Sequence, residues 1–314
     1  MEWFAAEGNG PLIAVRAIHF AGSAVITGIL VFRTWVAKPA LPSEQAVAGI
    51  WRTQSLRVAW IALAVTLLSG VGWLLLQAVS MSGLPPGEAM TSQVLSTVLN
   101  ETQFGMVTEI RSVLAVILAS CLAYDRLPLA DWLALAAALG LTASIAGTGH
   151  AASTLGALGN LHLAADALHL VAAASWIGGL VPFALLLVAV LRHDGASLAP
   201  DATQRFSTLG IVSVVTLAMT GLVNSWILVG SFRGLLVTEY GQVLMLKLVV
   251  FAAMLVFAAV NRFALTPRLI VSSGNDREAV RRLMRNSTVE IGLGLAIFAI
   301  VGVLGTLHPA IHFS

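Results

Sequence analysis

Histidine is the residue type whose placement most clearly suggests chemistry in this chain. His162, Asp166 and His169 follow one another at spacings i, i+4 and i+7. In a helix this spacing puts all three side chains on one face, over about 10 Å of helix. Imidazole is the commonest metal ligand in proteins, and it suits copper, zinc, iron and nickel. The pattern therefore predicts a helix face that binds a metal ion.

Four more histidines are predicted to lie toward the same side of the molecule, and only His193 falls on the opposite side. Ionisable side chains inside a bilayer are costly and usually mark function. The candidate metal ligands are His19, His150, His162, Asp166, His169, His308 and His312.

The elements that carry these residues are predicted to be membrane helices. The chain is 58% hydrophobic and only 10% charged, whereas soluble domains have about 25% charged residues. Several apolar runs reach the roughly 20 residues that a helix needs to cross a bilayer. We expect eight spans, at about 12–36, 57–79, 107–124, 129–148, 163–191, 208–229, 242–264 and 288–307.

The distribution of basic residues predicts the orientation of these spans. All Lys and Arg residues except Arg16, Arg111, Arg233 and Lys247 fall after odd-numbered spans. Because cytoplasmic loops carry the excess of positive charge, both termini are expected in the periplasm. The net charge of +2 is too small to indicate nucleic-acid binding. Cys121 is the only cysteine, which excludes an intrachain disulfide.

The sequence contains an apparent internal duplication. The residues around His19 align with those around His169, Ser69-Gly70 aligns with Thr220-Gly221, and His150 aligns with His308. Equivalent points lie four spans apart, so the two halves should share one orientation, about an axis along the membrane normal. The predicted fold is an all-α bundle of four plus four helices, with halves at 1–158 and 159–314.

The duplication gives each half one deep histidine, His19 or His169, and one shallow histidine, His150 or His308. It also makes Arg16 the equivalent of Asp166, so a salt bridge between the halves is an alternative to metal binding by Asp166. Methionine thioethers select Cu(I), but no Met-x-x-Met cluster occurs, and packing is the expected role of Met81, Met90 and Met106.

Several motifs in the C-terminal half resemble one known family. They are Arg205-Phe206-Ser207, Thr220-Gly221, Asn224-Ser225, Tyr240-Gly241, Lys247, Asn261-Arg262 and Pro267, together with the stretch from His162 to Leu180. This pattern is similar to the copper resistance protein D (CopD/PcoD) family, with a CopD-like domain at about 204–306.

The resemblance implies a bacterial inner-membrane protein that moves copper from the periplasm to the cytoplasm and is not an enzyme. It also implies a periplasmic copper-binding partner of the CopC type. We expect that partner to be a separate chain, since the N-terminal tail is too short to hold such a domain.

Two other functions remain open on the residues alone. Histidines from different helices of a bundle also hold haem b, so His19, His150, His169 and His308 suit a haem-binding oxidoreductase as well. A non-catalytic scaffold that docks a copper chaperone is the third possibility. No nucleophile triad, phosphate-binding glycine loop or paired carboxylate indicates hydrolysis or ATP-driven transport.

Overall fold

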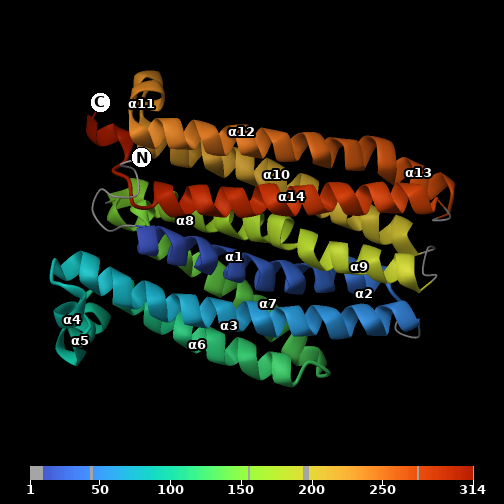
Figure 1. Cartoon of the computed structure of the whole chain (residues 1–314), viewed down its shortest axis with the longest axis horizontal. Coiled ribbons are helices and arrows are strands. Elements are labelled where there is room, and N and C mark those ends of the chain that lie inside the picture. The colour runs from blue at the N-terminus through green and yellow to red at the C-terminus, as the bar shows by residue number, and fades with distance from the viewer. Residues whose placement is uncertain (1–9, 43–44, 155, 194–197, 274–275, 314) are drawn as a thin grey trace.

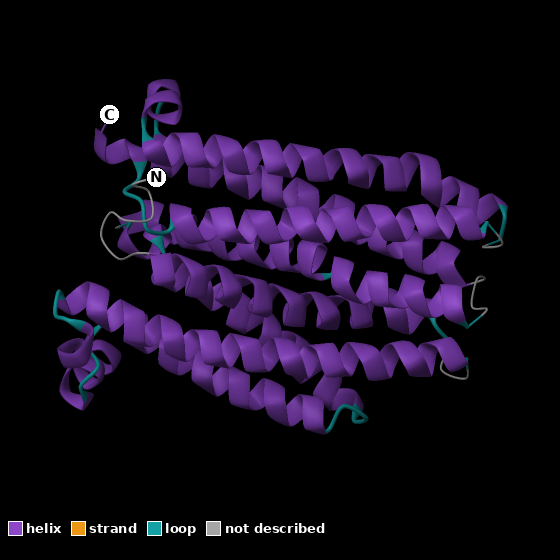
Figure 2. Cartoon of the chain, in the orientation of Figure 1, coloured by secondary structure: helices purple, strands orange, loops and turns teal. Residues whose placement is uncertain are grey.

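The computed structural model of the chain describes residues 10–42, 45–154, 156–193, 198–273 and 276–313. All regular secondary structure within these ranges is helical (Figure 2). Eight helical segments in them are long and apolar enough to cross a membrane. The predicted all-α bundle with eight spans is therefore confirmed.

The first four spans occupy the described part of the N-terminal half. Span 1 runs from Gly10 to Ala40 and includes a π-helical turn between α1 and α2. The elements are α1 Gly10–Phe32, η2 Arg33–Ala37, α2 Lys38–Ala40, α3 Ala46–Ser82, α4 Pro86–Ala89, α5 Ser92–Glu101, α6 Gln103–Ala123, α7 Pro128–Ala143, η3 Ser144–Thr148 and η4 His150–Ser153.

The last four spans occupy the described part of the C-terminal half. Span 5 also contains a π-helical turn, between α8 and α9. The elements are α8 Gly156–Ala173, η5 Ala174–Gly178, α9 Leu180–Arg192, α10 Ala199–Val229, α11 Phe232–Val237, α12 Glu239–Val260, η7 Asn261–Leu265, α13 Thr266–Val271, α14 Arg277–Leu304 and η8 Ala310–Phe313.

Spans 1 and 5 form the centre of the bundle. Each is 72% buried over its most apolar window, whereas the window of span 7 is 11% buried. The two central spans cross where Gly28 meets Gly178, because a Cβ atom on Gly28 would collide with the backbone of Gly178. Glycine at both positions lets the backbones approach closely, as small residues do at other membrane helix crossings.

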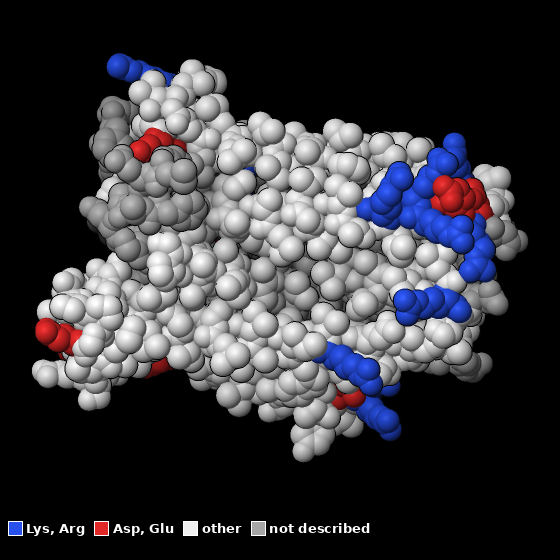
Figure 3. All heavy atoms as spheres, in the orientation of Figure 1, with Lys and Arg blue, Asp and Glu red and all other residues white. Residues whose placement is uncertain are grey.

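The two ends of the bundle differ in charge. The start of α1 and the end of α14 lie at one end, together with α4, α5 and α11, and we call it the terminal end (Figure 1). Most Lys and Arg side chains in view gather at the opposite end, which we call the basic end (Figure 3). This asymmetry is the one that sequence reasoning used to predict orientation.

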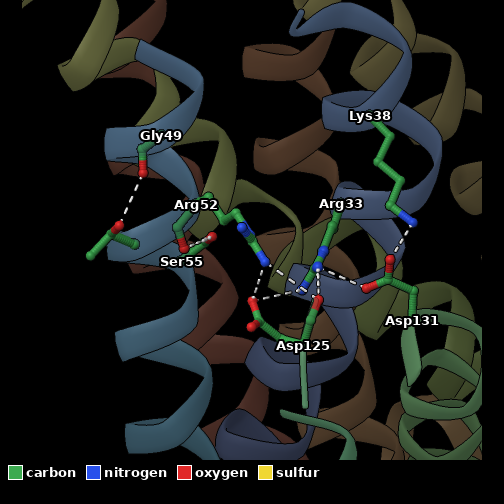
Figure 4. A network of polar contacts seen from close by, with 8 residues as sticks. Arg33, Lys38, Gly49, Arg52, Ser55, Asp125 and Asp131 are labelled. Carbon is green, nitrogen blue, oxygen red and sulfur yellow. Dashed lines mark hydrogen bonds and ion pairs between the residues drawn. The ribbon is translucent and has the colours of Figure 1, made fainter. Parts of the chain in front are cut away.

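An ion-pair network ties the first four spans together at the basic end (Figure 4). Arg33 on η2 pairs with Asp131 on α7 at 2.7 Å, and Lys38 reaches the same carboxylate at 2.6 Å. Arg52 on α3 pairs with Asp125, in the turn between α6 and α7, at 2.8 Å. The network fixes how spans 1, 2 and 4 meet, and span 1 carries His19.

Candidate metal site

The predicted histidine face lies on α8, at the terminal end of span 5. His162 is buried there, with 1% of its surface exposed, whereas Asp166 and His169 are half-buried. The three side chains follow one another along the helix toward the middle of the bundle, as the spacing i, i+4, i+7 predicts.

The deep histidine of this face is held in one orientation by α10. Nδ1 of His169 lies 2.9 Å from the hydroxyl oxygen of Thr220. That hydroxyl donates its single hydrogen to the carbonyl oxygen of Thr216, at 2.6 Å. Nδ1 of His169 must therefore carry the ring proton and donate it to Thr220. Nε2 is left with a free lone pair, as in histidines that bind metals.

His19 on α1 is held in the same way by α3. Its Nδ1 lies 3.0 Å from the hydroxyl oxygen of Ser69, and that hydroxyl donates to the carbonyl oxygen of Val65 at 2.6 Å. Nε2 of His19 is buried without a hydrogen-bond partner. Nδ1–H is thus the donor here too, and the lone pair of Nε2 is free.

A glycine makes room for each deep ring. A Cβ atom on Gly70 would lie 3.4 Å from Cε1 of His19, and one on Gly221 would lie 3.5 Å from Cε1 of His169. In each half the hydroxyl of Ser69 or Thr220 thus orients the histidine ring, and the following glycine, Gly70 or Gly221, leaves room for it. This parallel supports the predicted duplication, which stays a prediction.

The net charge around the two deep histidines differs. Beside His169, Asp166 accepts a hydrogen bond of 3.2 Å from Asn224, and Lys247 is close enough to interact with its charge. Beside His19, Arg16 and Arg111 both approach the ring of Trp73. The surroundings of His169 are therefore close to neutral, and those of His19 are positive. A metal cation is repelled less at His169.

His150 and His162 lie close together at the terminal end. Nε2 of His150, on η4, lies 3.3 Å from the carbonyl oxygen of Leu304 on α14. The hydroxyl of Thr154 lies 2.9 Å from Nδ1 of His162 and 3.4 Å from the carbonyl oxygen of His150. His150 is also close enough to His162 for their charges to interact. These two histidines form the mouth of the face on α8.

The remaining candidates are more peripheral. His308 is exposed beyond the end of α14. His312 falls on η8, and its side chain lies outside the described residues. Within the described ranges, no group of three or more His, Cys, Asp or Glu side chains comes together as a metal centre. The candidate ligands are thus spread out between the terminal end and the middle of the bundle, rather than gathered at one point.

The structure gives no support to a haem held between the deep histidines. His19 hydrogen-bonds to α3, and His169 hydrogen-bonds to α10, so the two rings are fixed against different helices. The alternative salt bridge is not formed either, since no ion pair joins Arg16 to Asp166 in the described parts of the chain. Asp166 is bound instead by Asn224.

Sequence reasoning missed the side chains that hydrogen-bond to the candidate ligands. Thr154 carried no visible signal, and Asn224 was noted only as part of the family motif Asn224-Ser225, not as a partner of Asp166. Ser69 and Thr220 carried a signal, because they precede glycines at equivalent positions of the duplication.

Two sequence families match the chain. The family described as Copper resistance protein D matches residues 200–304. The family described as Copper resistance protein D-like, N-terminal domain, matches residues 7–160. Together the two matches cover most of the chain. Of the candidate site residues they include His19 and His150, whereas His162, Asp166, His169, His308 and His312 lie outside both matches.

Three curated proteins are similar over 95% of this chain. Inner membrane protein YebZ of Escherichia coli (strain K12) is 28% identical, and the match covers 98% of its length. Copper resistance protein D of Pseudomonas syringae pv. tomato is 29% identical, with 96% of its length covered. Copper transport protein CutJ of Bacillus subtilis (strain 168) is 29% identical, and the chain spans 53% of it. No solved structure matches the chain.

Proposed function

Because the chain belongs to the copper resistance protein D family, we propose that it binds copper and moves it from the periplasm to the cytoplasm. The observation that carries the proposal is the face on α8, where His162, Asp166 and His169 follow one another into the bundle. The eight apolar spans and the similarity to an inner membrane protein agree with a multi-pass protein of the inner membrane.

We propose that the terminal end faces the periplasm. The basic end then lies in the cytoplasm, where positively charged loops are favoured. In this orientation His150 and His162 stand at the periplasmic mouth, and His308 is exposed beyond the end of α14. They would take copper first and pass it to Asp166 and then to His169.

The lone pair on Nε2 of His169 is the feature that suits it to receive copper. The proton on Nδ1 is fixed by Thr220, so the free nitrogen is available without loss of a proton. Asp166 adds a negative charge one turn away, which lowers the cost of a cation in the bilayer. His19 offers the same lone pair, but Arg16 and Arg111 oppose a cation there.

The source of the copper is proposed to be a separate periplasmic protein of the CopC type, as the family resemblance implies. The copper-related names of two relatives describe resistance and transport rather than a reaction. This agrees with the expectation that the chain is not an enzyme.

Metal analysis and a visible spectrum of the purified protein test the proposal together. We expect copper to bind at a fixed stoichiometry that falls when His162 and His169 are both changed to Ala. His193→Ala, at the basic end, is the matched control and should bind as the wild type does. Copper binding that is equal in all three proteins would contradict the proposed face. A Soret band with a sharp reduced α-band would support the haem alternative instead.

A further inference from the structure

Two arginines share one tryptophan within the first four spans. Cζ of Arg16, on α1, lies 5.0 Å from the ring centroid of Trp73, and Cζ of Arg111, on α6, lies 5.8 Å from it. The exposed fractions are 7% for Arg16, 9% for Arg111 and 1% for Trp73. Two guanidinium groups are thus buried against one indole on α3.

No carboxylate in the described parts of the chain neutralises these two cations. Among the described residues, neither arginine takes part in an ion pair. A guanidinium cannot lose its proton in a protein, so burial cannot make it neutral. Contact with the face of Trp73 offsets only part of the cost of removing a cation from water. Arg16 also lies against Gly305, at the C-terminal end of α14, where the helix dipole supplies a partial negative charge.

Three hydrogen-bond donors at this place have no acceptor. They are Nε of Arg16, Nε1 of Trp73 and Nη2 of Arg111, and each is buried without a partner. All three atoms can only donate. Nε2 of His19, whose ring packs edge-on against Trp73 at 5.3 Å, is unpartnered as well. A buried group of unsatisfied donors with two positive charges calls for an acceptor that carries negative charge.

In the C-terminal half, the equivalent position holds a carboxylate of the chain. In the predicted duplication Arg16 is equivalent to Asp166, and Arg111 is equivalent to Lys247. In the C-terminal half this pair of positions therefore holds one negative and one positive charge, which interact. Among the described residues of the N-terminal half, no negative partner pairs with Arg16 or Arg111.

We propose that Arg16, Arg111 and Trp73 bind a small monovalent anion, with chloride as the simplest ligand of this class. The anion takes the place that the carboxylate of Asp166 occupies in the other half, and the three donors surround it. Arg16 lies six residues from the start of α1 at Gly10, or about 9 Å of helix rise, so the anion enters from the terminal end.

The bound anion also changes what His19 can do. It cancels one of the two positive charges against Trp73, on which the ring of His19 packs, so a metal cation meets less repulsion at Nε2. Copper binding at His19 then depends on chloride. This second step rests on the proposed function, whereas anion binding itself does not.

Thermal unfolding without copper tests the anion site directly. The purified protein is compared in chloride and in gluconate at equal ionic strength, over a series of chloride concentrations. We expect the unfolding midpoint to rise with chloride and to saturate, since a ligand that binds only the folded state stabilises it. Arg16→Gln and Arg111→Gln should weaken the apparent chloride affinity at least tenfold. Arg233→Gln, an exposed arginine at the terminal end, is the matched control and should respond as the wild type does.

A second variant keeps the test decisive if a glutamine variant unfolds. Arg16→Asp installs the carboxylate of the equivalent position, so its midpoint should be independent of chloride and equal in both salts. A parallel series with acetate distinguishes halides from carboxylates as the bound anion. The proposal is overturned if the wild-type midpoint is the same in chloride and gluconate, or if Arg16→Asp keeps the full chloride response. Because copper is absent, these outcomes do not depend on whether the protein transports copper.

Discussion

Replacing Thr220 by valine tests how the structure prepares His169 for a metal. The change keeps the shape of the side chain and removes the oxygen that accepts the proton of Nδ1 at 2.9 Å. The ring can then carry its proton on Nε2, which would block the lone pair. Loss of a side chain that orients a metal-binding histidine typically weakens metal affinity 10–100-fold, or by about 1.4–2.7 kcal/mol.

Competition with a chromogenic Cu(I) chelator measures this affinity. We expect Thr220→Val to bind copper about 10–100-fold more weakly than the wild type. Thr220→Ser should bind normally, because serine supplies the same oxygen and stands at the equivalent position 69. Thr208→Val, an exposed threonine with the same bond to its own helix, is the control for the loss of a hydroxyl on α10. Wild-type affinity in Thr220→Val would refute the assignment of the ring proton.

Three further predictions concern the fold and are measured by thermal or denaturant unfolding. Gly28→Ala should destabilise the protein by about 1–3 kcal/mol or more, since its Cβ atom meets backbone; Gly72→Ala, which meets only ordinary side-chain contacts, should not. Asn261→Ala should cost about 1–3 kcal/mol, because the buried carboxylate of Glu290 loses its 2.7 Å hydrogen bond; no loss would mean that this bond is not formed. Asp131→Asn should cost about 1 kcal/mol or less, and the difference should shrink at high salt, as partly exposed ion pairs are screened; a cost that is independent of salt would contradict that explanation.

The number and order of the spans followed from hydropathy, but their ends did not. The second span was predicted at 57–79, and the helix runs over Ala46–Ser82. Hydropathy detects only the part of a helix that lies in hydrocarbon. The first turns of α3 carry Arg52 and Arg57, which lower the mean hydropathy although the helix continues through them. The π-helical turns in spans 1 and 5 left no signal in the sequence.

The helical spacing placed the histidines on a face, but it could not place the partners of that face. His162, Asp166 and His169 are local in sequence, so a single helix determines how they are arranged. Thr220 lies on another helix, and its role follows from how α8 and α10 pack.

The predicted duplication was also insufficient to predict contacts between the residues that it makes equivalent. Around the twofold axis that it predicts, such residues would meet only near the axis; Gly28 and Gly178 do meet. Arg16 lies twelve residues before Gly28, or about 18 Å along the helix, where spans 1 and 5 are no longer at their crossing. Arg16 packs instead on Trp73 within its own half.

Copper uptake into proteoliposomes tests the central claim most directly. The protein is oriented with the terminal end outward, and uptake is compared between the wild type, His162→Ala with His169→Ala, and the control His193→Ala. The account predicts uptake by the wild type and the control, and little or none by the double variant. Uptake by the double variant at the wild-type rate would contradict the path along α8.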